Sequence, residues 1–275
     1  MRERIEQLFA LPSDQLPLDE ANALFSELKA ALNAGTVRSA EPDGAGGWRV
    51  NLWVKQGILL GFRAGALADV STDGFSFLDK ANLPVRRLDV ADGVRVVPGG
   101  SAIRDGAYIA PGVICMPPMY INIGAYVDEG SMVDSHALVG TCAQIGKRVH
   151  VSAAAQIGGV LEPIGANPVI VEDDVMVGGN CGVYEGTVVR TRAVLAAGVV
   201  LTASTRVYDV VNECVLAASA DAPLEIPEGA VVVPGTRAIR GVFAEENGLA
   251  VASPVIVKYR DARTDARTAL EGALR

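Results

Sequence analysis

The sequence predicts a mainly β protein, with a parallel β-solenoid of about six coils between an α-rich N-terminal domain and a small C-terminal cap. Two observations favour this fold class. An aliphatic residue returns at every sixth position from Val97 to Val207. Half of the 275 residues are apolar, but only 5% are aromatic and 30 are glycine. That composition suits short strands of Val, Ile and Leu joined by tight turns.

The six-residue repeat is the main signal. Seventeen of its eighteen anchor positions are Val, Ile or Leu: Val97, Ile103, Ile109, Cys115, Ile121, Val127, Val133, Val139, Ile145, Val151 and Ile157, then Val171, Val177, Val183, Val189, Leu195, Leu201 and Val207. Four residues after an anchor the side chain is usually small or Val: Ala107, Val113, Ala125, Ser131, Ala137, Ala143, Val149 and Ala155. Three units of one strand and one turn close a triangular coil, with the anchors inside and the small residues at its corners.

The pattern divides the chain into three predicted domains. Residues 1–93 are α-rich, since Leu24, Phe25, Leu28 and Leu32 follow helical spacing and a short strand running into a second helix is expected near residues 48–65. Residues 94–239 form the coil, with the repeat returning at IPEGAV after a gap. Residues 240–275 form a cap over its open end, which repeat proteins need for solubility.

One interruption breaks the repeat at residues 158–168, between the anchors Ile157 and Val171. A solenoid cannot absorb such an insertion inside its coil, so we expect a loop that projects from a corner. It is either a neutral insertion or a flap that forms a wall over a ligand groove, and we favour the flap because loops on rigid scaffolds tend to carry binding sites.

Charge and cysteine content limit the partners. The net charge of −8 argues against nucleic acid or an anionic membrane as the main partner. The sequence has no apolar run long enough for a membrane span, and its start does not resemble a signal peptide. The four cysteines form no close pair, so we expect free thiols and a cytoplasmic protein.

Several linked motifs occur in order between residues 95 and 174: RVVPGG, NIGAYVDEG, MVDS, CAQIGK, IGGVLEP and ANPVIVEDD. Over about residues 48–260 the chain resembles the tetrahydrodipicolinate N-succinyltransferases, a family of hexapeptide-repeat acyltransferases in lysine and diaminopimelate biosynthesis. The resemblance implies a left-handed parallel β-helix and a homotrimer with active sites between subunits. It also implies succinyl-CoA as the co-substrate, a cyclic imine dicarboxylate as acceptor, and no metal or prosthetic group.

The reaction of an amine with a thioester requires a deprotonated amine, two reactants held together and donors for the oxyanion. Asp134 follows the inward anchor Val133, so its side chain should point outward, and the resemblance places the active-site carboxylate there. One branch of that family carries a second active-site Glu near residue 182, where this chain has Gly182. Glu185, which also matches a family position, is the second catalytic candidate. His136 remains an alternative base, because His titrates near neutral pH; His150 is expected on the solvent side of the coil.

Substrate and co-substrate contacts are also implied by matched positions. Arg95 would bind a substrate carboxylate in a bidentate manner, with Arg104 as a second candidate. The residues expected along the CoA groove are Gly179, Ala197 and Ser204, with Lys258 meeting a phosphate.

The sequence leaves two alternative functions open and argues against a third. An acetyl-CoA-dependent transferase on a related amino-dicarboxylate would share these motifs. A non-catalytic scaffold would need only the repeat. A β-helical carbonic anhydrase needs three His on zinc, and the chain contains only His136 and His150.

Overall fold

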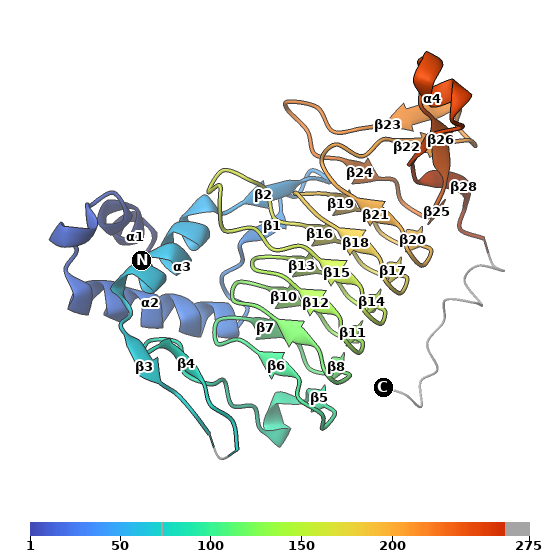
Figure 1. Ribbon diagram of the computed structural model, residues 1–275. Helices are drawn as coiled ribbons and strands as arrows, with labels where there is room; N and C mark the ends of the chain where they lie inside the picture. The colour runs from blue at the N-terminus through green and yellow to red at the C-terminus, as the bar shows by residue number, and fades with distance from the viewer. Residues whose placement is uncertain (73, 262–275) are drawn as a thin grey trace.

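The computed structural model describes residues 1–72 and 74–261, so the end of the predicted cap, residues 262–275, lies outside the described residues. Its centre is a parallel β-helix of short strands stacked into three sheets (Figure 1). The chain passes from sheet 1 to sheet 2 to sheet 3 and back, and one such circuit is a coil. The predicted mainly β fold with an N-terminal helical part is confirmed.

Each sheet receives one short strand from every coil. Sheet 1 contains β5 (Arg95–Val96), β8 (Ile114–Cys115), β11 (Met132–Val133), β14 (His150–Val151), β17 (Met176–Val177) and β20 (Val194–Leu195). Sheet 2 contains β6 (Ala102–Ile103), β9 (Tyr120–Ile121), β12 (Leu138–Val139), β15 (Gln156–Ile157), β18 (Gly182–Val183) and β21 (Val200–Leu201). Sheet 3 contains β7 (Tyr108–Ile109), β10 (Tyr126–Val127), β13 (Gln144–Ile145), β16 (Ile170–Val171), β19 (Val188–Val189) and β24 (Glu225–Ile226).

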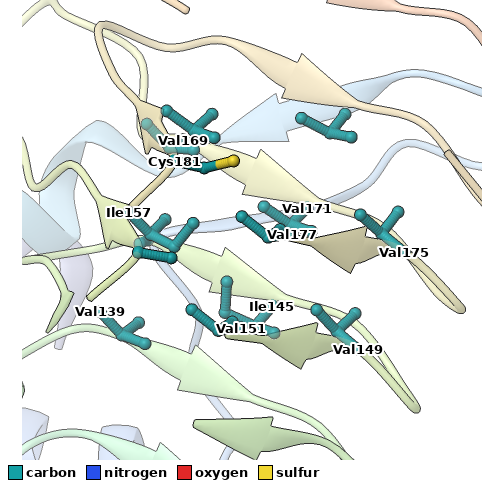
Figure 2. Packing of buried hydrophobic residues seen from close by; sticks show 14 of the residues in the cluster. Val139, Ile145, Val149, Val151, Ile157, Val169, Val171, Val175, Val177 and Cys181 are labelled. Atoms are coloured by element: carbon teal, nitrogen blue, oxygen red, sulfur yellow. The ribbon is translucent and has the colours of Figure 1, made fainter. Parts of the chain in front are cut away.

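The anchors fill the inside of the coil, as the repeat predicts. Every predicted anchor from Ile109 to Val207 is buried, and so are all eight small or Val residues four positions on. Figure 2 shows anchors such as Val151 and Val177 stacked on one another, with Val149, Val175 and Cys181 completing the corners. Each fully buried Val, Leu or Ile side chain contributes roughly 1.5–3 kcal/mol relative to exposure, so the interior column is the main source of stability.

The six-residue repeat does not predict the pairing at the two ends of the β-helix. At the first strand Val96, not Val97, pairs with Cys115, a spacing of nineteen residues instead of eighteen. The prediction that Val97 is the first anchor is therefore wrong, and Val96 is exposed because no earlier coil covers it. At the other end, the last predicted anchor, Val207, is buried but belongs to the cap. The sixth strand of sheet 3 is instead β24, where Ile226 pairs with Val189.

The N-terminal segment lies against sheet 3 (Figure 1). Its elements are α1 (Arg2–Phe9), η1 (Ser13–Gln15), α2 (Leu18–Asn33), β1 (Ala40–Pro42), β2 (Trp48–Val50), α3 (Leu52–Ala64), β3 (Leu67–Asp69), β4 (Leu78–Lys80) and η2 (Val90–Asp92). The strand running into a second helix is thus present as β2 and α3. Ala40 and Trp48 pack on Ile170 and Val188, and the Arg38 guanidinium lies 3.7 Å from the Tyr126 ring centroid, a cation–π contact.

The cap extends sheet 1 beyond the last coil. Its elements are β22 (Val207–Asp209), β23 (Cys214–Leu216), β25 (Ala230–Val233), β26 (Thr236–Ala238), α4 (Val242–Glu246), β27 (Ala250–Ala252) and β28 (Val255–Tyr259). Strand β25 continues the parallel stack on β20, and β28 then runs antiparallel to it. This change of direction ends the regular stack of coils at β25, and β22 of the cap then pairs with β28 in parallel. Within the described residues, no helix has both the length and the apolar character needed to cross a bilayer.

Candidate active site

The outward face of sheet 1 carries a ladder of side chains in register. Strand pairing aligns one outward residue per strand, which gives the series Arg95, Ile114, Met132, His150, Met176, Val194, Val231 and Lys258. The middle of this ladder is mostly apolar, and a basic residue stands at each end. Two of the predicted site residues, Arg95 and Lys258, are therefore the two ends of one outward column.

Asp134 lies beside this ladder, at the corner that joins sheet 1 to sheet 2. Its backbone N–H donates to Val151 O at 2.9 Å, which extends the ladder of β11 and β14 by one residue. Its Oδ1 accepts the Ser135 N–H at 2.7 Å, and its Oδ2 lies 3.7 Å from His150 Nε2. The side chain is partly exposed, at 29%, so the carboxylate is fixed by the turn and still open to a ligand.

His150 is more enclosed than the sequence indicated. The prediction that it faces solvent is only partly right: it points out of the coil, but its side chain is just 16% exposed between Met132 and Met176. Neither ring nitrogen has a hydrogen-bond partner within residues 1–72 and 74–261. Burial lowers the pKa of His150, with the Asp134 carboxylate acting in the opposite direction. The imidazole is therefore neutral near pH 7.

The corners between sheets 1 and 2 form a continuous backbone column. Ala154 N donates to Ser135 O at 2.8 Å, Asn180 N to Ala153 O at 3.0 Å, and Gly198 N to Gly179 O at 3.0 Å. Two predicted CoA contacts, Gly179 and Ala197, belong to this column, two and three coils beyond Asp134. The structure thus brings the predicted catalytic carboxylate and two predicted CoA residues onto one edge of the coil.

A groove of about 590 Å³ continues from this edge onto the cap. Its lining includes Gly198, Ser204, Arg206 and Arg237, and Ser204 Oγ lies 3.1 Å from Thr202 Oγ1. A second hollow of about 390 Å³ shares two of these arginines and adds Arg240. No Asp or Glu is among the described residues that line either hollow. In a chain of net charge −8, three clustered arginines make this end of the groove locally basic.

Other predicted site residues lie elsewhere in the chain. Glu185 is at a corner between sheets 2 and 3, with a positive φ of 53°, and its Oε2 accepts the Ala203 N–H at 2.8 Å. Arg104 occupies the corresponding corner of the first coil and pairs with Asp79 of β4 at 2.6 Å. Within one chain, therefore, neither is at the Asp134 corner. His136 is there, exposed, as the left-handed residue of the turn with φ 61°.

Gly182 lies on the outward side of sheet 2. A Cβ on Gly182 would lie 2.4 Å from Tyr184 Cε2, a distance that real Cβ atoms do not show. The Tyr184 ring therefore occupies the space that a larger residue at 182 would need. A side chain at position 182 would therefore require the Tyr184 ring to move.

The loop at residues 158–168 projects from a corner between sheets 2 and 3 and packs on the N-terminal segment. Leu161 contacts the cluster that contains Ile58, and the buried Lys55 donates from Nζ to Ala166 O at 2.5 Å. The loop is not at the Asp134 corner of its own chain. It could line the site only from a neighbouring subunit.

Sequence reasoning missed the three arginines of the groove and the enclosure of His150. The arginines come from residues 206, 237 and 240, which have no shared spacing, and the fold of the cap brings them together. For His150 a signal was present: it is the outward partner of a strand whose neighbours carry Met132 and Met176 at the same position of the repeat.

Comparison with known proteins agrees on one family. Residues 1–64 match the model of the tetrahydrodipicolinate N-succinyltransferase N-terminal region, and residues 168–203 match the hexapeptide repeat of succinyl-transferase. The 2,3,4,5-tetrahydropyridine-2,6-dicarboxylate N-succinyltransferase of Rhodopseudomonas palustris strain TIE-1 is 44% identical over 251 residues, which is 89% of this chain and 86% of that protein. Enzymes with the same name from Polynucleobacter asymbioticus and Bordetella petrii are 42% and 41% identical, covering 96% and 98% of this chain and 93% and 97% of their own.

Proposed function

Because the chain belongs to the tetrahydrodipicolinate N-succinyltransferase family, we propose that it transfers the succinyl group of succinyl-CoA to the amine of hydrated or ring-opened tetrahydrodipicolinate. The observation that carries the proposal is the identity of 44% over 89% of the chain, a span too long to leave out Asp134. The resemblance drawn from the motifs is confirmed. The product belongs to lysine and diaminopimelate biosynthesis.

The reaction needs positioning more than covalent help. The amine nitrogen attacks the thioester carbonyl carbon, a C–N bond forms, and the C–S bond breaks. The amine loses one proton, and the leaving thiolate of CoA takes up one proton. Asp134 is our candidate for the group that orients the amine and accepts its proton, because its carboxylate is partly exposed and fixed on one oxygen by Ser135 N–H.

Arg95 suits the acceptor's carboxylate. It lies on the same sheet as Asp134, two strands earlier, and strands are about 4.8 Å apart, so the two side chains are about 10 Å apart along the coil axis. A dicarboxylate acceptor has a reactive amine and distant carboxylates, and such a spacing allows both ends to be held at once. Glu185 and Arg104 would need to come from a neighbouring subunit to join them.

We place CoA along the column of corners between sheets 1 and 2. Gly179 and Ala197 present small side chains, so the backbone can pair closely with the pantetheine arm. The groove then leads to Arg206, Arg237 and Arg240, which suit the phosphate groups of the nucleotide end. Lys258, which lies 3.2 Å from Asp261 Oδ2, remains a further candidate for a phosphate.

The proposed assembly is a homotrimer with active sites between subunits, as the family resemblance implies. Sheet 3 is covered by the N-terminal segment, whereas sheets 1 and 2 carry apolar residues on their outward faces. Met132 and Met176 lie on sheet 1, and Tyr120, Leu138 and Val200 lie on sheet 2. Burial of these faces against neighbouring subunits would remove apolar surface from water and complete the site with the loop at residues 158–168.

A cytoplasmic location follows from the proposed metabolic role. The four cysteines are all free thiols, three of them buried, and a reducing compartment keeps them in that state.

A thiol-release assay tests the function. We expect acceptor-dependent release of CoA from succinyl-CoA at least about tenfold faster than from acetyl-CoA, and a loss of about 100-fold or more in the Asp134→Asn variant with an unchanged assembly state. A faster reaction with acetyl-CoA would identify an acetyltransferase. Absence of turnover together with absence of thermal stabilisation by either donor would identify a scaffold.

A further inference from the structure

His150 is the more enclosed of the two histidines in the described chain, and nothing in its own fold explains its polarity. It stands in the outward ladder of sheet 1 between Met132 and Met176, a position that an apolar residue would fill. Both ring nitrogens are shielded from solvent and lack a hydrogen-bond partner among the described residues. An unsatisfied buried polar group costs roughly 1–3 kcal/mol, so its retention points to a use.

The only charged group that acts appreciably on this ring, among the described residues, is Asp134. Its Oδ2 lies 3.7 Å from His150 Nε2, while its Oδ1 is already held by the Ser135 N–H at 2.7 Å. A distance of 3.7 Å is too long for a hydrogen bond, but hydrogen bonds in active sites without substrate are often long and shorten when the substrate binds.

We propose that His150 is a positioning residue for Asp134, whose Nε2–H donates to Oδ2 of the carboxylate when the acceptor amine is bound. The proposal rests on the proposed function, because it gives Asp134 the role of orienting the amine. With one oxygen held by the turn and the other by His150, the plane of the carboxylate is fixed. The amine then meets its oxygen lone pairs in one orientation, and misorientation is what lowers the rate of such reactions.

The burial of the ring serves this role. A neutral imidazole carries a single N–H, and in this environment the ring stays neutral at physiological pH. It can therefore donate to the carboxylate without placing a positive charge beside an incoming amine. A cation at this position, such as Lys or protonated His, would repel the ammonium form of the acceptor and weaken its binding.

The test compares two substitutions that fill the same space. His150→Met matches the neighbours Met132 and Met176 and removes the donor, whereas His150→Gln keeps an N–H donor near the position of Nε2. We expect His150→Met to lower kcat by about 10- to 100-fold, the loss typical of a hydrogen bond to a charged group, with the KM for succinyl-CoA unchanged. His150→Gln should recover most of that loss.

Thermal melts of both variants separate this role from a structural one. Met in an apolar ladder should match or exceed the melting temperature of the wild type, so its loss of rate cannot come from unfolding. A His150→Met enzyme with wild-type kcat would overturn the proposal. So would a stably folded His150→Gln enzyme as slow as His150→Met. His136→Gln is the comparison at the chain's other histidine, and a larger loss there than at His150 would also overturn it.

Failure of the proposed function would look different. If wild-type enzyme shows no turnover with succinyl-CoA and acceptor, the reaction is wrong and the role of His150 falls with it. If the wild type turns over and Asp134→Asn is inactive, but both His150 variants are fully active, only the positioning role is lost.

Discussion

At the scale of single residues, function is concentrated just outside the coil. Asp134 is held by a turn hydrogen bond from Ser135 N–H, and the arginines at 206, 237 and 240 line the groove where the coil meets the cap. Asp134 and Arg206 each stand next to an inward aliphatic residue, Asp134 after the anchor Val133 and Arg206 before Val207, the first residue of β22. Alternation along the strand thus makes one residue structural and the next available for chemistry.

The arginine cluster gives a prediction at this scale. Arg237→Ala combined with Arg240→Ala should raise the KM for succinyl-CoA by about 10-fold or more, because charge-assisted hydrogen bonds to phosphate are lost. The value of kcat should stay near that of the wild type, since the reacting atoms lie about three coils away. Steady-state kinetics at fixed ionic strength measure both.

A matched control is Arg87→Ala combined with Arg2→Ala, which removes the same charge from outside both hollows. If KM rises equally in the control, the rise comes from the change in net charge, and the groove is not a phosphate site.

At the scale of elements, the N-terminal hairpin of β1 and β2 is fastened to sheet 3 by a partly buried carboxylate. Glu172 Oε1 accepts from Trp48 Nε1 at 2.9 Å and pairs with Arg190 at 2.8 Å, and its Oε2 accepts the Thr191 N–H at 2.9 Å. Arg190 also donates to Gly46 O at 3.0 Å. These contacts tie a loop more than a hundred residues away in sequence to the coil.

The pH dependence of stability follows from this cluster. Burial acts to raise the pKa of Glu172, but the hydrogen bonds from Trp48, Arg190 and Thr191 outweigh it and lower the pKa. The ionised form is therefore favoured by folding, and its stabilisation is present above the unfolded pKa, about 4.3, and is lost as the pH falls through the folded pKa. Glu172→Gln should lower the free energy of unfolding at pH 7 by about 1–3 kcal/mol and flatten its acid dependence in urea titrations.

Glu129→Gln provides the comparison for this carboxylate. Glu129 pairs with Lys147 on the surface, with 58% of its side chain exposed, and such pairs contribute about 0–1 kcal/mol. An effect of Glu129→Gln as large as that of Glu172→Gln would show that the acid dependence is a general charge effect and not the fastening of the hairpin.

The elements also show what sequence can and cannot predict. The interior of the coil was predictable because a period of six places each anchor at an equivalent position, and every anchor from Ile109 to Leu201 is buried, on both sides of the loop at residues 158–168. The ends were not, because the first and last strands lack a coil on one side. At the first strand Val96, not Val97, pairs with the next coil. At the last strand the inward residue is Ile226, not Val207, because the chain first passes through strands of the cap. The hand of the coil was implied only by the family resemblance.

The site was predictable in part for the same reason. Asp134 lies one residue after a sheet 1 anchor, and Gly179 and Ala197 lie two residues after theirs, so their common edge follows from the period. The enclosure of His150 and the meeting of the arginines depend on side-chain packing and on the irregular cap, which no periodicity encodes. The loop at residues 158–168 was predicted to leave the coil, and it does so, but its contacts with Lys55 and the cluster around Ile58 required the structure.

At the scale of the whole molecule, the three sheets differ in what covers them. Sheet 3 is covered within the chain, and the proposed trimer would cover sheets 1 and 2. Val200 lies on the outward face of sheet 2 and is 48% exposed in the single chain. Val200→Glu should leave the fold of the chain intact, because the side chain has room, but should weaken self-association by placing a charge in an apolar contact.

Light scattering coupled to size exclusion measures this effect. We expect the wild type to elute as a trimer and Val200→Glu to shift toward the monomer. The assembly state is the deciding measurement, because Val200 also lines the groove of about 590 Å³. Val242→Glu on α4, at a Val that is 73% exposed, is the matched control and should remain trimeric. A trimeric Val200→Glu would remove sheet 2 from the interface.

The stacking register has a consequence for how the chain can change in length. Between β6 and β21, partner residues on adjacent coils are eighteen positions apart, except across the loop at residues 158–168, where Gln144 pairs with Ile170. A single residue inserted or deleted within a strand would turn the inward side chains outward, and the outward ones inward, in the rest of that coil. Lengthening is harmless only where the extra residues leave through a corner or where a full coil of eighteen is added. Chains with coils of this kind should therefore differ in length by whole coils of eighteen residues. Any other insertion should lie at a corner between two sheets.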